Sequence, residues 1–195
     1  MKMKKMKKMK KMIIYLSLVS ALCLILGACA PAKEGSGDTI KIATVGPITG
    51  DGAVWGTQQV QGAELAIADI NAAGGLLGKE VELVSLDDKG DPKEAVSVAQ
   101  RIVDDPGIVA VIGHFYSGST IAAGPIYTKG KVPVVAVAAT NPKVVDVGGE
   151  YVFRINMSDA AAGADMASYV VGKLGKKAIA VLRGQDEYAQ GVFEA

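Results

Sequence analysis

Short apolar runs alternate with longer segments of helical periodicity from Thr39 to the end of the chain. The run at 107–113, "GIVAVIG", is apolar over its whole length, as strands buried on both faces are. Parallel strands need crossover segments between them, and here each apolar run is followed by a helical pattern after a short connection. The alternation therefore predicts an α/β fold in which helices cover both faces of a doubly wound parallel sheet.

The expected strands share apolar, β-branched composition and lie at 39–46, 81–88, 107–113, 132–139, 151–155 and 177–183. The expected helices lie at 56–75, 91–105, 117–130, 158–175 and from about Glu187 onward. The clearest helix start has Asp91 as N-cap, Pro92 at the first helical position and Glu94 in place to close a capping box.

The first 28 residues have the build of an export signal. Lysines precede an apolar stretch from Met12 to Leu26, which is shorter than the ~20 residues of a permanent membrane span. The four residues that end it, "LGAC" at 26–29, resemble the lipobox of bacterial lipoproteins, in which cleavage leaves the cysteine lipidated at the new N-terminus. We therefore expect a signal peptide over 1–28 and lipid on Cys29, with an ordinary signal peptide as the alternative.

Removal of residues 1–28 would leave 14 basic against 20 acidic residues, a net charge of −6. An acidic chain is a poor partner for nucleic acid, whose phosphates favour basic surfaces. No cysteine follows Cys29, so disulfides cannot stabilise the folded part. Residues 29–38 are small and mostly polar, as in a flexible tether.

Hydroxyl-bearing residues follow two expected strands. Ser117 opens the helix after 107–113, where unpaired backbone N–H groups and the helix dipole favour an anion such as a carboxylate. The alternative is that Ser117 only caps that helix. The next strand ends in "AATNP" at 138–142, which is expected to offer a free carbonyl at Ala138 and the hydroxyl and N–H of Thr140. Ligands of open parallel sheets collect at these carboxyl ends, so we expect the two loops to meet around one ligand.

Four further residues near strand ends have weaker signals. Trp55, the only tryptophan, lies in a glycine-rich loop and is expected to face a cleft, with packing as the alternative. Asp159 follows the strand at 151–155, where Ser158 or Asp159 could instead cap the next helix. Tyr188 also follows an expected strand. His114 has no second histidine for a metal site or proton relay, so it is expected to be a satisfied loop residue without a catalytic role.

Enzyme motifs are lacking. Asp87 and Asp88 are adjacent and would point to opposite sides of a strand, which argues against a catalytic carboxylate pair. "SGST" at 117–120 lacks the lysine of a phosphate-binding loop, and "GDGAVWG" at 50–56 is a distorted dinucleotide fingerprint. No serine has a histidine base available. We expect no catalytic residue, cofactor or metal.

Five segments together resemble the type I periplasmic binding proteins for branched-chain amino acids. They are "IKIATVGPITGDGAVWGTQQVQGAELAIADINAAGG" at 40–75, "DDKGDPKEAVSVAQRIV" at 87–103, "VIGHFYSGST" at 111–120, "AATNP" at 138–142 and "GQDEYAQG" at 184–191. The resemblance covers the chain from about Thr39 to its end. It implies two similar α/β lobes, joined by a hinge, that close on a ligand.

The resemblance also implies roles for individual residues. Ser117 would hydrogen-bond the ligand carboxylate, and Thr140 would bind the ligand through its backbone and hydroxyl groups. The Ala138 carbonyl would accept from the ligand ammonium, and Ala139 between them is also expected at the ligand. Trp55 resembles the aromatic residue that packs on the aliphatic side chain. The residues expected to meet the ligand from the second lobe are Asp159 and Tyr188. Phe115 and Tyr116 add bulk before Ser117, which departs from the pattern of the family. This departure leaves open which ligand side chain the site accepts.

We therefore expect part of the first ligand-binding lobe at 39–155 and a truncated start of the second lobe at 156–195, because the last helix would be cut in its first turns. The expected function is that of a lipid-anchored, extracytoplasmic substrate-binding protein that passes an amino acid to the permease subunits of an ABC importer. Two alternatives are a receptor of the same fold for an amide, urea or aromatic acid, and a fragment of a dinucleotide-dependent dehydrogenase.

Overall fold

The structure is a computed structural model and describes residues 39–195. The expected signal peptide, Cys29 and the tether lie outside these residues. Five parallel strands form one sheet in the order β2-β1-β3-β4-β5. Their bounds are β1 (Ile40–Gly46), β2 (Val81–Asp87), β3 (Ile108–Gly113), β4 (Val134–Ala136) and β5 (Val152–Arg154).

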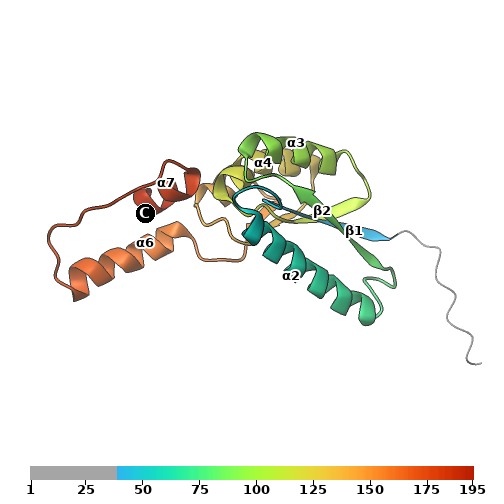
Figure 1. Cartoon of the computed structure of the whole chain (residues 1–195), viewed down its shortest axis with the longest axis horizontal. Helices are drawn as coiled ribbons and strands as arrows, with labels where there is room; N and C mark the ends of the chain where they lie inside the picture. Colours follow the sequence, from blue (N-terminus) through green and yellow to red (C-terminus); the bar gives the residue numbers. More distant parts are fainter. Residues whose placement is uncertain (1–38) are drawn as a thin grey trace, which may run out of the picture. The chain divides into compact units, whose positions relative to one another are not determined.

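Helices lie on both faces of the sheet, as Figure 1 shows: α2 lies on one side, and α3 and α4 lie on the other. The bounds of these helices are α2 (Ala53–Ala72), α3 (Pro92–Val103) and α4 (Ser117–Gly130). A shorter helix, α5 (Lys143–Gly148), packs on α4 and was not expected from the sequence. The predicted α/β class and parallel sheet are confirmed.

The core lies between the sheet and helices α3, α4 and α5. It is built from small and β-branched residues together with one aromatic ring, Tyr127. Ala43, Val45, Val134 and Ile102 are each completely buried. Full burial of a valine or isoleucine side chain stabilises a fold by roughly 1.5–3 kcal/mol, so the apolar runs that predicted the strands also supply the core.

Helix α3 begins as its sequence predicts, apart from one contact. The Asp91 side chain accepts hydrogen bonds from the backbone N–H groups of Lys93 and Glu94, at 2.7 and 3.1 Å, and Pro92 is the first helical residue. The capping box is not closed, because the Asp91 N–H donates to the Asp88 carbonyl and the Glu94 carboxylate pairs with Lys89. The N-cap prediction is confirmed and the reciprocal Glu94 contact is wrong.

The chain after β5 differs from the expected pattern. The helix expected at 158–175 is divided into α6 (Asp159–Ala167) and a π-helical segment, η2 (Ser168–Lys173). The strand expected at 177–183 does not form, and its residues are exposed. A strand gains its backbone hydrogen bonds from a neighbouring strand, and within residues 39–195 none lies beside this segment. The last helix, α7 (Glu187–Glu194), begins where it was expected.

No helix within residues 39–195 is both long and apolar enough to cross a membrane.

Candidate functional site

The order of the strands places a crevice at the carboxyl ends of β1 and β3. From β1 the chain moves outward to β2, then returns past β1 to β3 and continues to β4 and β5. The loops after β1 and β3 therefore diverge at neighbouring strand ends, which is where open parallel sheets bind ligands. Trp55 and Ser117 belong to helices that start from these two loops.

An aromatic pair lines one side of the crevice. Trp55, on the first turn of α2, is half exposed, and its ring stacks on Phe115 with centroids 6.1 Å apart and planes inclined by 22°. Both rings line a cavity of about 400 Å³ that extends to Val137 and Ala138 at the end of β4. The expectation that Trp55 faces a cleft thus agrees with its exposure and with this cavity.

The Ser117 hydroxyl lies at the start of α4 without capping it. Tyr116 is the N-cap residue, Ser117 is the first helical residue, and no side chain makes a capping hydrogen bond there. The alternative that Ser117 serves only as a cap is therefore wrong. Ser117 is buried, and its Oγ accepts a long hydrogen bond of 3.4 Å from the Asn141 N–H. The turn after β3 and the loop after β4 thus lie side by side.

The loop 138–141 is held mainly through its carbonyl groups. The Ala138 carbonyl, expected to be free, accepts a 3.1 Å hydrogen bond from the Asn156 side chain. The Thr140 carbonyl accepts from the Asp159 N–H at 3.0 Å and from Arg154 at 3.1 Å. Ala139 is buried. The Thr140 hydroxyl is also buried, and it has no hydrogen-bond partner among the described residues.

Asp159 lies at the start of α6 and is buried. Ser158 is the N-cap, since its hydroxyl accepts from the Ala160 N–H, so capping does not explain Asp159. Its Oδ2 has no hydrogen-bond partner within the part of the chain described. A methyl group added at Gly191 would lie within 3 Å of both this oxygen and the Asn141 side chain. Asp159 therefore lies between the 138–141 loop and Gly191 of α7.

Tyr188 is not brought to the same place. It is about half exposed on α7 and lines a separate apolar hollow of about 480 Å³ between α6 and α7, together with Met166 and Phe193. Helix α7 nevertheless contacts the loop, because the Asn141 side-chain amide donates to the Glu187 carbonyl. The structure thus brings together Trp55, Ser117, Ala138, Ala139, Thr140 and Asp159 around neighbouring strand ends, and leaves Tyr188 apart.

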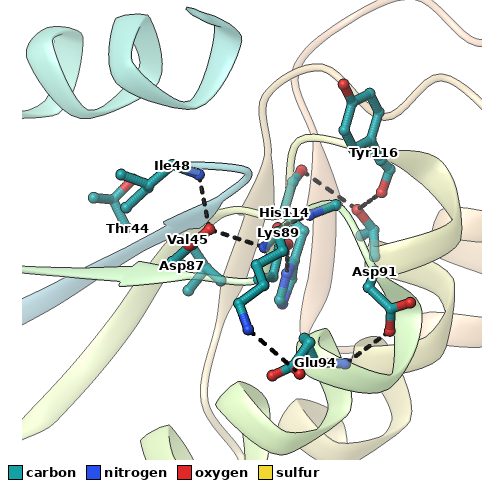
Figure 2. Close-up of polar contacts among 12 residues, drawn as sticks. Thr44, Val45, Ile48, Asp87, Lys89, Asp91, Glu94, His114 and Tyr116 are labelled. Carbon is teal, nitrogen blue, oxygen red and sulfur yellow. Dashed lines mark hydrogen bonds and ion pairs between the residues drawn. The ribbon is translucent and has the colours of Figure 1, made fainter. Parts of the chain in front are cut away.

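Asp87 and Asp88 point in different directions, as expected. Asp87 Oδ1 accepts from the N–H groups of Ile48 and Lys89, as Figure 2 shows. Oδ1 also accepts from the Thr49 N–H, and Oδ2 accepts from the Thr49 hydroxyl. Burial acts to raise the pKa of Asp87, but the hydrogen bonds from Thr49, Lys89 and Ile48 together lower it below its ordinary value of 3.8. Asp87 therefore anchors the loop that leads to Trp55.

His114 is a satisfied residue, as expected, and it is completely buried. Its Nδ1 lies 2.6 Å from Asp88 Oδ2, and its Nε2 lies 3.0 Å from the Tyr127 hydroxyl. Within residues 39–195, no group of three or more histidine, cysteine, aspartate and glutamate side chains is placed to hold a metal ion.

Three contributors to the site were missed in the sequence. The side chains of Arg154 and Asn156 donate to backbone carbonyls of the 138–141 loop. The Asn141 side chain joins this loop to α7 by donating to the Glu187 carbonyl. Arg154 had a signal, since it is a charged residue within an otherwise apolar strand. Asn141 and Asn156 had none, because backbone carbonyls that need a donor are not visible in a sequence.

Comparison with known proteins gives consistent matches. Residues 39–193 match the family model described as "Periplasmic binding protein". The Leu/Ile/Val-binding protein of Citrobacter freundii is 40% identical over 175 residues, which are 90% of this chain and 46% of that protein. The chain spans less than half the length of the curated relatives it matches.

Solved structures give the same result. A leucine-binding protein from Thermotoga maritima matches with a TM-score of 0.72 and 34% identity, over 80% of this chain and 44% of that one. A branched-chain amino acid transporter substrate-binding protein from Streptococcus pneumoniae, solved with isoleucine, matches with a TM-score of 0.64 and 38% identity, over 70% and 39%. These relatives are named as binding proteins, as expected of a non-enzymatic chain, and the dehydrogenase alternative is not supported.

Proposed function

The chain belongs to the type I periplasmic binding proteins, in the family of the branched-chain amino acid binding proteins, and from this premise we propose that it binds a branched-chain or other aliphatic amino acid for an ABC importer. The family implies an extracytoplasmic location. The proposal includes delivery of the ligand to permease subunits and attachment to the membrane through lipid on Cys29. It also includes the division into a first lobe at 39–155 and the beginning of a second lobe at 156–195.

The observation that carries the proposal is the pair of hydroxyls at neighbouring strand ends. Ser117 Oγ lies at the N-terminus of a 14-residue helix, and the one hydrogen bond it makes within residues 39–195, from the Asn141 N–H, is long at 3.4 Å. Thr140 Oγ1 is buried without a partner among the described residues. A buried hydroxyl without a partner is costly, so an acceptor such as a carboxylate oxygen would stabilise this arrangement. The dipole of α4 adds to the attraction for an anion.

The aromatic pair suits the apolar part of the ligand. Trp55 and Phe115 form one wall of the cavity that reaches Ala138, so an aliphatic side chain placed there would leave water. Ser117 does not line this cavity, and we propose that the ligand extends past Ala138 so that its carboxylate meets Ser117. Burial of apolar surface contributes roughly 25 cal/mol per Å². The Ala138 carbonyl keeps a second lone pair beside its bond from Asn156 and can accept from the ligand ammonium.

Residues after β5 would complete the site on closure. Asp159 has a buried, unpartnered carboxylate oxygen close to Asn141, and we propose that it meets the ligand from the second lobe. Tyr188 faces another hollow, so its proposed contact requires α7 to move relative to α6. A ligand can drive such a closure only by binding the closed state more tightly than the open one.

Titration of the 195-residue chain with leucine tests the proposal. Because the chain spans less than half the length of its relatives, we expect weak binding, which amide chemical-shift changes in NMR can detect. Ser117→Ala removes one hydrogen bond to a charged ligand and should raise the Kd by about tenfold to a hundredfold. Ser97→Ala, on the exposed face of α3, is the matched control and should leave the Kd unchanged.

Three further ligands separate the alternatives. Leucinamide should bind more weakly than leucine if the carboxylate is recognised, and a preference for the amide would favour a receptor for amides. Stronger binding of 4-hydroxybenzoate would favour a receptor for aromatic acids, and tighter binding of urea than of leucine would favour a urea receptor. Shift changes with leucine that are identical in wild type and Ser117→Ala would contradict the assigned site.

A further inference from the structure

A chain of buried hydrogen bonds connects three elements behind the proposed carboxylate site. Asp88 follows β2, His114 follows β3, and Tyr127 lies within α4. His114 Nδ1 is 2.6 Å from Asp88 Oδ2, and His114 Nε2 is 3.0 Å from the Tyr127 hydroxyl. All three residues are completely buried. Polar side chains in a core are costly unless they are satisfied, so their presence there needs an explanation.

One arrangement of protons satisfies every atom in this chain. With hydrogen on Nδ1, neutral His114 donates to Asp88, and its Nε2 accepts from the Tyr127 O–H. Burial first, and then the negative charge of Asp88, raise the pKa of the Tyr127 phenol well above its ordinary value, so the phenol keeps its proton as a donor. The other Asp88 oxygen accepts from the Gly90 N–H at 2.8 Å. The chain is therefore complete without water or a further partner.

The two ends of this chain fix the turn that carries Ser117. Toward the loop after β2, Asp88 holds both His114 and Gly90, and a methyl group on Gly90 would lie 2.8 Å from the ring of Tyr116. Figure 2 shows Tyr116 and His114 on this turn, near the loop that contains Lys89. Toward the helix, Tyr127 is ten residues after Ser117, or about 15 Å along α4. The imidazole thus links the turn to the body of the helix that the turn begins.

Hydrogen bonds within the turn couple the position of His114 to that of the first turn of α4. The Thr120 hydroxyl donates to the Tyr116 carbonyl at 2.9 Å and to the His114 carbonyl at 3.4 Å. The Thr120 N–H also donates to the Tyr116 carbonyl, at 3.0 Å. A shift of His114 would therefore move residues 116–120 together, and with them the distance between Ser117 Oγ and the 138–141 loop.

We propose that His114 is a positioning residue for ligand binding, which holds the Ser117 turn in place by bridging Asp88 and Tyr127. The inference rests on the proposed function, since it assigns the purpose of this chain to the recognition of a carboxylate. A role in core stability alone would affect all ligands equally, whereas a positioning role affects the carboxylate selectively.

Two substitutions break the chain at different links. Tyr127→Phe keeps the ring and removes the hydroxyl, which leaves Nε2 unpaired. His114→Asn keeps a donor near Asp88 and loses the contact with Tyr127. The matched control is Asn71→Ala, because the Asn71 side chain also makes two hydrogen bonds to the backbone of Val81, at 2.8 and 2.9 Å, but at the opposite end of the sheet.

The first readout compares leucine with leucinamide in the 195-residue chain. We expect Tyr127→Phe and His114→Asn to weaken leucine binding by about tenfold and to change leucinamide binding by less than about twofold. Asn71→Ala should lower the Tm and leave the ratio of the two affinities unchanged. An equal loss for both ligands in Tyr127→Phe, or an unchanged leucine affinity, would overturn the inference.

The second readout needs no ligand and separates this inference from the proposed function. Amide hydrogen exchange of Thr120 and Ile121, the first hydrogen-bonded N–H groups of α4, should accelerate by about tenfold in Tyr127→Phe and His114→Asn, and should stay unchanged in Asn71→Ala. If the wild-type chain binds neither ligand, the proposed function fails and exchange alone decides whether His114 positions the turn. Unchanged exchange at these amides would reject that role.

Discussion

Replacement of Arg154 should loosen the loop that carries Thr140. The guanidinium Nη1 donates to the carbonyls of Thr140 and Asn141, at 3.1 Å each, from the end of the neighbouring strand β5. Hydrogen bonds from a charged group contribute about 1.5–3 kcal/mol each. Both carbonyls keep a second donor, the N–H of Asp159 for Thr140 and that of Val144 for Asn141. Arg154→Met should therefore cost about 2 kcal/mol rather than the full value of two such bonds.

Urea denaturation of the 195-residue chain, followed by circular dichroism, measures this loss. Arg154→Lys keeps the charge but offers one ammonium group in place of the planar guanidinium. We therefore expect its free energy of unfolding to lie between those of wild type and Arg154→Met. Arg101→Met removes an exposed charge near the end of α3 and should change stability by less than about 0.5 kcal/mol. A loss of unfolding free energy in Arg154→Met no larger than that in Arg101→Met would refute the idea that Arg154 stabilises the loop of Thr140.

Two further predictions concern the loops after β2. Because the pKa of Asp87 is lowered in the folded protein, its contribution to stability should be fully present above the ordinary value of 3.8 and should be lost progressively as the pH falls below it. Asp87→Ala should therefore be less stable than wild type at pH 6 in urea titrations, and the difference in unfolding free energy should shrink as the solution is acidified below pH 3.8. A difference of constant size across this acid range would contradict the assignment. Asp91→Ala should lower the free energy of unfolding by about 1 kcal/mol through loss of the α3 N-cap, which would be seen as a lower Tm. Asp91→Asn should keep most of this stabilisation, because its side-chain oxygen can also accept from the helix N–H groups. Equal Tm values for wild type and Asp91→Ala would show that the Asp91 cap does not stabilise α3.

The candidate site could be predicted from sequence where the signal was a residue type at a strand end. Ser117 and Thr140 followed apolar runs, and the parallel sheet brought their loops together through the contact of Asn141 with Ser117. Their partners could not be predicted in the same way. The Ala138 carbonyl has a donor in Asn156, which is 18 residues away along the chain. Such contacts depend on which strands are neighbours, and an isolated strand pattern does not contain that information.

Tyr188 illustrates a second limit. Its position after an expected strand suggested a place in the crevice, yet the strand at 177–183 does not form and the ring faces the hollow between α6 and α7. A strand pattern specifies apolar alternation, but the strand forms only when a neighbour supplies its hydrogen bonds.

The sequence by itself determined the succession of strands and helices from β1 to β4, the parallel class of the sheet and the start of α3 at Asp91. These features follow from interactions between residues close in the chain and from the burial that apolar runs require. Only the tertiary structure decided that His114, expected to be satisfied but with unspecified partners, bridges Asp88 and Tyr127 in the core, and that Arg154 holds the loop of Thr140. Those contacts join residues from separate strands and helices, and they exist only once the order of strands in the sheet has set which loops are neighbours.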